Sequence, residues 1–206
     1  MGTDPTAEEL AAAAQAGSKD GFTRLVERFE GPLYNFVLLR IGDAGEAEEL
    51  VQETFLRAWS RIGSYRPRWR FATWLFTIAR RLAASHHRVR RPRPTSGAAL
   101  DALTTGGGDP SSALDDREER SRVWDLAKRV LTEDQRSALW LRYAEDLSVQ
   151  EIAEVLGRRT STVRVLMFRA RARLAEHLEP ERVAGSSAPA ATVPELRWSP
   201  QRIPEA

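Results

Sequence analysis

The chain has 206 residues with a formal net charge of +2 and contains no cysteine. Its length suits one or two compact domains with tails, and the lack of cysteine excludes disulfides, thiolate metal sites and thiol catalysis. No apolar run approaches the roughly 18 residues of a membrane span, and the N-terminus is acidic and alanine-rich. We therefore expect a soluble, cytoplasmic protein without membrane insertion or a signal peptide.

Charge is distributed unevenly along the chain. Lys19 and Lys128 are the only lysines, so nearly all positive charge is guanidinium, which forms paired hydrogen bonds with phosphate and guanine. Residues 54–100 hold eleven arginines and no acid, whereas residues 43–53 hold five acids and no base. The sign of the charge in each segment therefore says more about binding partners than the small net charge of the whole chain.

The first forty residues predict helices with one interruption. Residues 6–16 are alanine-rich and predict a helix that stops at Gly17. Apolar side chains at i, i+3, i+4 and i+7 from Phe22 predict the next helix, which the Gly-Pro pair at 31–32 is expected to break or kink. The apolar face that follows is closed by Gly42.

An acidic helix follows. Asp43 with Glu46 predicts a cap for a helix that runs to about Ser60. Its inward face would consist of Ala47, Leu50, Val51, Thr54 and Ala58. Glu46, Glu49 and Glu53 share another face beside Gln52. Such a row is either a solvated face or a docking surface for a basic partner.

Aromatic residues and arginines interleave between residues 64 and 82. Pro67 keeps the first part a loop, and a helical pattern begins near Phe71. Aromatic rings stack on unpaired bases at roughly 1–3 kcal/mol each, and arginines bind the backbone. The alternative is a core role, which suits Trp74 and Phe76 at least as well. Tyr65 and Trp69, in a loop crowded by arginines, are harder to explain as packing.

The second half predicts a linker and a helix-turn-helix. Residues 88–112 are rich in arginine, proline and glycine, as is typical of a flexible linker. Thr132 and Gln135 cap one helix, and Ser148 with Glu151 caps the next. Gly157 supplies the turn, and a second, arginine-rich helix begins near Ser161 and stops at Pro180. The ordinary alternative is a helical hairpin.

Catalytic and metal motifs are missing from the sequence. His86-His87 and His177 lack a partner at i, i+4 or a nearby carboxylate, so no metal site is expected. No phosphate cradle, nucleophile elbow or paired carboxylates in an apolar setting can be found. We expect neither enzymatic activity nor a cofactor.

Three motifs in this order resemble the extracytoplasmic-function (ECF) sigma factors of the sigma-70 family. Residues 47–55, AEELVQETF, are similar to region 2.2, and residues 71–80, FATWLFTIAR, to regions 2.3 and 2.4. The stretch from Leu131-Thr132 through Glu151-Ile152-Ala153 to Thr162-Val163 is similar to region 4. The match covers roughly residues 20–178, and the compact length favours this group over the longer primary sigma factors.

The resemblance implies three contact surfaces. The clamp helices of core RNA polymerase would be bound by Asp43, Glu46, Glu49, Gln52, Glu53 and Phe55. The melted −10 element, with one base flipped out, would be bound by Tyr65, Arg66, Trp69, Trp74, Arg80, Arg81, Ser85 and Arg88. The −35 element would be read in the major groove by Arg158, Arg159, Thr160, Ser161, Thr162, Arg164, Val165, Phe168 and Arg169. An anti-sigma factor that covers the same surfaces is a further implied partner.

The sequence departs from the family pattern at four positions. Arg81 stands where the family usually has Asn and Ser85 where it usually has Asp, so we transfer no −10 sequence to this chain. Val165 and Leu166 replace a polar pair. This leaves fewer hydrogen-bonding groups for base edges and favours contact with a thymine methyl or readout of DNA shape.

We expect an all-α fold of two small helical domains, one like sigma region 2 and one like the helix-turn-helix of sigma region 4, joined by a flexible linker. The expected divisions are a segment with a short helix at 1–19, domains at 20–90 and 114–180, a linker at 91–113 and a disordered tail at 181–206.

The sequence thus predicts an alternative sigma factor. It would direct core RNA polymerase to promoters through −10 and −35 elements and assist promoter melting. The alternative is a free-standing helix-turn-helix regulator, which would bind duplex DNA alone and need no acidic docking face. A module for RNA or single strands, led by residues 65–93, would leave the C-terminal helices without a purpose.

Overall fold

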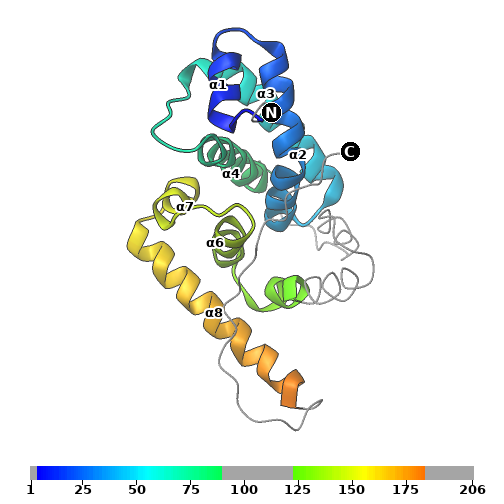
Figure 1. Ribbon diagram of the computed structural model, residues 1–206. Coiled ribbons are helices and arrows are strands. Elements are labelled where there is room, and N and C mark those ends of the chain that lie inside the picture. The colour runs from blue at the N-terminus through cyan, green and yellow to red at the C-terminus, as the bar shows by residue number, and fades with distance from the viewer. Residues whose placement is uncertain (1–3, 90–122, 184–206) are drawn as a thin grey trace, which may run out of the picture.

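The computed structural model describes residues 4–89 and 123–183, and every regular element in these ranges is a helix (Figure 1). This confirms the all-α expectation. The elements are α1 Ala7–Gln15, α2 Lys19–Ile41, α3 Ala44–Arg61, a 3-10 turn η1 Ile62–Ser64, α4 Phe71–Val89, helical residues 123–130, α6 Glu133–Tyr143, α7 Val149–Leu156 and α8 Thr160–Val183. The predicted linker at 91–113 and residues 184–206 of the predicted tail lie outside the described residues. No described helix is both long and apolar enough to cross a membrane.

Helices α1 to α4 form an N-terminal unit around α2, which contacts the other three (Figure 1). Leu25, Leu33 and Phe36 of α2 are fully buried in its core with Phe71 and Phe76 of α4. Gly42 ends α2 in the left-handed conformation, and the Asp43 side chain then accepts a hydrogen bond from the backbone N–H of Glu46 at the start of α3. The capping residues thus place the turns where the sequence predicted them.

A helix break at Pro32, one of the two expected outcomes there, is wrong, because α2 runs without interruption from Lys19 to Ile41. Proline removes one backbone N–H donor from a helix. Leu25 and Phe29 before the proline and Leu33 and Phe36 after it are buried in the same core. Their burial, worth roughly 1.5–3 kcal/mol for each side chain, outweighs the lost hydrogen bond.

Helices α6 to α8 form a C-terminal unit in which the predicted caps are confirmed. Thr132 with Gln135 and Ser148 with Glu151 both make full capping boxes. Gly157 ends α7 with φ 59°, and α8 then begins at Thr160. The expected stop at Pro180 is wrong, since α8 continues to Val183. A proline near a helix C-terminus costs one hydrogen bond but does not prevent one further turn.

The two units pack on each other, which the sequence did not predict. Helix α4 contacts α7, and the C-terminal part of α2 lies beside α6 (Figure 1). Trp140 of α6 packs between Phe36 and Phe76, with ring centroids 6.0 and 5.8 Å away. The buried apolar residues of both units, with the exception of Ala14, therefore belong to one cluster.

The loop between α6 and α7 carries a part-buried acid. Arg70, just before α4, donates from Nη1 to the backbone oxygens of Glu145 and Asp146 at 3.3 and 3.2 Å. Burial raises the pKa of the Glu145 carboxyl to about 7, and the nearby Arg70 charge opposes the shift only in part. Glu145 is thus a charged group that the packed structure disfavours at neutral pH and above.

Gly157→Ala should lower the free energy of unfolding more than Gly42→Ala. Both glycines have positive φ, 59° and 78°, so a side chain costs about 1 kcal/mol at either position. A Cβ at Gly42 would meet nothing within 4 Å, whereas at Gly157 it would lie 3.0 Å from Nη2 of Arg80. Urea unfolding of both variants measures the difference, and an equal loss would mean that the Arg80 contact contributes nothing.

Glu145→Gln should raise the melting temperature at about pH 8 and have little effect near pH 4.5. The folded pKa of about 7 exceeds the ordinary 4.5, so the folded state binds the proton more tightly and stability falls as the pH rises between these values. Glutamine is never charged and removes that loss. Thermal melts over this pH range test it, with the exposed Glu30→Gln as control. A gain that is constant with pH would exclude titration of Glu145 as its cause.

Candidate nucleic-acid interface

Helix α8 presents one continuous exposed face. Val163, Met167 and Ala170 are buried and attach the helix to its unit. The predicted groove-reading residues Ser161, Thr162, Arg164, Val165, Phe168 and Arg169 are all exposed. Val165 is 47% and Phe168 67% exposed, so both present apolar surface on this face. The face therefore combines cationic, hydroxyl and apolar groups, the types that contact phosphates, base edges and thymine methyls.

The arginines next to this face differ in how free they are. Arg158 donates from Nε and Nη2 to Oδ2 of Asp134 at 3.1 and 2.7 Å, so it is partly engaged in the fold. Arg173 donates to the backbone oxygen of Val130. Arg159, Arg164 and Arg169 are exposed, and their guanidinium groups form no hydrogen bond or ion pair with the described residues. These three are the arginines of this face that are free to bind a phosphate or a base.

Tyr65 is a core residue, so the expectation that its ring is free to stack on a base is wrong. It is 2% exposed and packs edge-on against Phe71, with centroids 5.5 Å apart. Its hydroxyl donates a hydrogen bond to the backbone oxygen of Trp69. The pKa of the phenol is raised, mainly by burial and to a smaller extent by the negative charge of Glu8. The buried ring packs against the loop and orders it. The arginine-rich sequence of the loop gave no sign of this core role.

The other predicted strand-binding aromatics lie closer to the surface. Trp74 is half-buried and packs against Tyr65 and Phe71. Trp69 is half-buried at the end of the loop, with the Arg68 guanidinium 5.5 Å from its ring centroid. Arg66 is exposed and donates to the backbone oxygens of Gly63 and Tyr65. Trp69 is therefore the aromatic ring in this loop that a base could reach.

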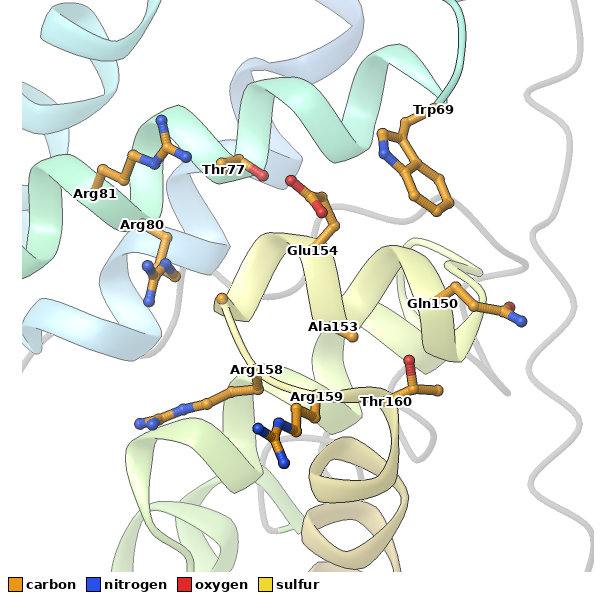
Figure 2. Close-up of a pocket in the computed structure, with 11 residues that line it drawn as sticks. Trp69, Thr77, Arg80, Arg81, Gln150, Ala153, Glu154, Arg158, Arg159 and Thr160 are labelled. Carbon is orange, nitrogen blue, oxygen red and sulfur yellow. The ribbon is translucent and has the colours of Figure 1, made fainter.

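Arg80 points from α4 toward the C-terminal unit (Figure 2). Its Nη1 donates to the backbone oxygen of Leu156 at 2.9 Å, at the C-terminal end of α7 where carbonyls lack helical partners. Arg81 and Ser85 are exposed, and the side chain of Arg88 lies outside the described residues. Among the described arginines that were predicted to bind the melted strand, Arg80 is thus the one that hydrogen-bonds to the other unit.

A cleft of about 640 Å³ lies between the units beside Arg80 (Figure 2). Trp69, Thr77 and Arg81 line it from the N-terminal unit, and residues 157–160 line it from the turn before α8. The predicted strand-binding and groove-reading residues therefore share the walls of one cleft. In the described ranges, no three histidines or acids lie together as a metal site would require.

Helix α3 carries an exposed acidic face. Glu49 and Gln52 are exposed, and Glu53 pairs with Arg57 at 2.6 Å. Glu46 lies 3.8 Å from Nδ1 of His86. Asp43 is the α3 cap described above, so its role is at least partly structural.

Phe55 is buried in the core of the N-terminal unit, so its assignment to the docking surface is wrong. Leu56, 66% exposed, and Trp59, 38% exposed, lie beside the acidic residues instead and were missed. Spacing could have identified Leu56, because Glu49, Gln52, Glu53 and Leu56 follow i, i+3, i+4 and i+7. The acidic face thus has an apolar edge.

Two further polar residues between the units were also missed. Arg40, in the last turn of α2, has a buried guanidinium that forms an ion pair with Glu133 and donates to the hydroxyl of Ser137 at 2.9 Å. Burial lowers the pKa of Arg40, and Glu133 opposes the shift.

Glu151 is the second of these residues, and its carboxylate accepts a hydrogen bond from the hydroxyl of Thr73 at 3.1 Å. Burial would raise the Glu151 pKa, but hydrogen bonds from Ser148 and Thr73 lower it overall.

The chain matches two protein-family models. Residues 25–93 match sigma-70 region 2, and residues 122–174 match sigma-70 region 4. Together these ranges contain the site residues of α3, α4 and α8 named in this subsection.

Curated relatives carry the same family name. The chain is 34% identical to the RNA polymerase sigma-H factor of Pseudomonas aeruginosa, over 87% of this chain and 97% of that protein. It is 34% identical to the ECF RNA polymerase sigma factor SigC of Mycobacterium tuberculosis, over 88% of this chain and 96% of that protein. It is 37% identical to the ECF RNA polymerase sigma factor BldN of Streptomyces coelicolor, but spans only 62% of BldN's length.

Two solved structures share the fold. CnrH, in complex with the cytosolic domain of CnrY, aligns with a TM-score of 0.60 and 26% identity, over 84% of this chain and 96% of that one. The sigma factor RpoE of Bartonella quintana, in complex with the anti-sigma factor NepR, aligns with a TM-score of 0.61 and 24% identity, over 79% and 98%. With both sigma regions matched, in order and within one chain, the protein belongs to the sigma-70 family, in its ECF group of RNA polymerase sigma factors.

Proposed function

We propose that this ECF sigma factor directs core RNA polymerase to promoters by three surfaces on α3, α4 and α8. The observation that carries this is the coexistence in one chain of an exposed acidic helix face and an exposed basic recognition helix. The first suits a basic protein partner and the second suits DNA. We assign the polymerase and −10 surfaces to residues 20–90 and the −35 surface to residues 114–180.

Polymerase docking is assigned to Glu49, Gln52 and Glu53 together with Leu56 and Trp59. Acidic side chains increase the rate of encounter with a basic surface, and exposed apolar side chains contribute most of the affinity once they are buried. Leu56 remains 66% exposed, whereas Trp59 packs one side of its ring on Phe22, with centroids 4.9 Å apart, and stays 38% exposed. They replace Phe55 in the proposed docking set.

Reading of the −35 element is assigned to the exposed face of α8. Arg164 and Arg169 would contact phosphates or guanine, and Val165 with Phe168 would contact thymine methyl groups. Val165 is one of the two apolar residues, with Leu166, that replace the usual polar pair, and this departure supports the assignment. We therefore expect thymine-dependent recognition in at least one position of the −35 element.

Reading of the −10 element is assigned to the loop and exposed side of α4. Trp69 supplies a ring for a flipped or unpaired base, and Arg66, Arg81 and Ser85 supply polar contacts around it. Trp74 supports this surface by packing against Tyr65, and the Tyr65 hydroxyl orders the loop through its bond to Trp69. Arg80 would join them when it is released from Leu156.

We assign the chain no catalytic activity of its own and place it in the cytoplasm, where its polymerase partner acts. An anti-sigma factor is a further partner in this proposal, because CnrH, at 26% identity, is held by the cytosolic domain of another protein. The exposed apolar residues Leu56, Trp59, Val165 and Phe168 are the surfaces that such a partner would cover.

Reversing the charge of the acidic face should weaken polymerase binding. Glu49→Arg with Glu53→Arg changes four charge units on α3, and loss of the exposed ion pair of Glu53 costs less than about 1 kcal/mol of stability. Glu27→Arg with Glu30→Arg makes the same change on exposed positions of α2. Co-purification with core polymerase should fall roughly tenfold or more in the first variant alone. Equal retention of both variants would contradict the docking assignment.

Run-off transcription tests the function as a whole. Purified core polymerase with the chain should initiate at discrete promoters on fragmented genomic DNA, and core polymerase alone should not. If the chain binds specific duplex DNA tightly but adds no initiation, the free-standing regulator is the better description.

A further inference from the structure

One residue of α1 fixes the start of the loop that carries Trp69. We call this segment, residues 62–70 between α3 and α4, the strand-reading loop. Nε2 of Gln15 donates to the backbone oxygens of Ile62 and Tyr65 at 2.9 and 3.0 Å. These acceptors belong to the tight turn η1 and to the residue directly after it. One amide group therefore fixes the direction in which the loop leaves α3.

A second residue of α1 fixes the end of the loop. The backbone N–H of Phe71, the first residue of α4, donates to Oε1 of Glu8 at 2.9 Å. The first N–H groups of a helix have no partner inside the helix, and a negative charge beside them is favourable. The first turn of α4 contains no acidic residue of its own. The Glu8 carboxylate thus supplies this charge from another helix.

The two contacts lie on one side of α1. Glu8 and Gln15 are seven residues apart, which corresponds to about two helical turns, or roughly 10 Å along the helix axis. Helix α1 contacts both η1 and α4. It therefore sets the distance between the two ends of the strand-reading loop. The middle of the loop stays accessible, since Arg66 and Arg68 are exposed and Trp69 is half-buried.

Helix α1 is itself fixed on α2. Leu10 and Ala14 of α1 are buried. A Cβ at Gly21 of α2 would lie 3.1 Å from the backbone oxygen of Leu10, so the two helices approach each other closely. Asp4, just before α1, pairs with Arg24 of α2 at 2.5 Å. The strand-reading loop is thus positioned by the central helix of the unit through α1.

Both holding residues lie outside the matched sigma region. The match to sigma-70 region 2 begins at residue 25 and ends at residue 93. It contains the strand-reading loop and α4, but neither Glu8 nor Gln15. The contacts that fix the loop therefore come from a part of the chain to which this match assigns no role.

We infer that α1 is a positioning element for recognition of the −10 strand, in which Glu8 and Gln15 hold the strand-reading loop so that Trp69 is presented to an unpaired base. The inference rests on the proposed function, because it takes this loop as the surface that binds the melted strand. Neither holding residue contacts DNA, and both act through the backbone of the loop. A loop that is already ordered loses less conformational freedom on binding, so its affinity is higher.

Gln15→Glu is the disrupting variant. It keeps the size of the side chain but replaces the donating NH2 group by a carboxylate oxygen, which faces the backbone oxygens of Ile62 and Tyr65. Ala16→Glu is the matched control, because it adds the same charge at the neighbouring exposed position of α1. Glu8→Gln is a milder second variant, since an amide oxygen can still accept the hydrogen bond but carries no charge.

Order in the loop can be measured without DNA or polymerase. The chain has no cysteine, so Arg68→Cys accepts a single nitroxide spin label in the exposed middle of the loop, and Glu30→Cys accepts one on α2. The loop label should gain a fast-motion component in Gln15→Glu and keep its original spectrum in Ala16→Glu. The α2 label should not change in either variant.

Two results of the spin-label experiment would overturn the inference. One is unchanged motion of the loop label in Gln15→Glu, which would mean that the loop is ordered without α1. The other is an equal change at both labels, which would mean that the whole N-terminal unit loosens and that Gln15 has no particular effect on the loop.

The effect on DNA binding is measured with a fluorescein-labelled pool of random single strands. Gln15→Glu should weaken binding of the free chain roughly threefold or more relative to Ala16→Glu, and Glu8→Gln should weaken it less. If Gln15 acts by presenting the ring of Trp69, Gln15→Glu should lose most of this effect in a Trp69→Ala background. An equal loss in both backgrounds would contradict action through the loop.

Failure of this inference and failure of the proposed function give different results. If Trp69→Ala alone leaves the affinity for the pool unchanged, the −10 assignment is wrong, and the spin label still reports whether α1 orders the loop. If Trp69→Ala weakens binding but Gln15→Glu weakens it no more than Ala16→Glu, the −10 assignment stands and the positioning role of α1 is wrong.

Discussion

The burial of one arginine charge determines how the two halves of this protein meet. Arg40 lies in the last turn of α2 with its side chain almost fully buried, and a guanidinium there is tolerated only with charged and hydrogen-bonding partners. Those partners, Glu133 and Ser137, are on the first two turns of α6 in the other unit. Trp140, one helical turn further, packs on Phe36 and Phe76. The orientation of the C-terminal unit follows from these contacts.

That orientation separates the functional surfaces into two kinds. The acidic face of α3 and the outer face of α8 remain exposed, so their chemistry is available in any arrangement of the units. The face of α4 that carries Thr73 and Arg80 is used in the contact itself. The contact between the units thus uses part of the α4 surface and leaves the α3 and α8 faces accessible.

Local rules accounted for most of the helical structure. Hydroxyl or carboxylate caps and left-handed glycines fixed the ends of α2, α3 and α7, because these depend on a few neighbouring residues. Burial was harder to predict. Tyr65 in an arginine-rich loop turned inward, Phe55 faced the core beside the exposed Leu56, and α2 continued through Pro32. Each of these outcomes depends on side chains far away in the sequence.

The sequence by itself determined the family, the helix-turn-helix, the acidic face and the arginine-rich surfaces, since motifs, caps and periodicity are local properties that survive without a view of the fold. Only the tertiary structure decided which of these residues are free. Arg80 and Arg164 are both arginines on predicted DNA-binding helices. In the structure, Arg80 donates to a carbonyl of the opposite unit, whereas Arg164 is exposed. The physical reason is that a long-range contact satisfies a polar group through residues 76 positions away, and no local pattern records that partner.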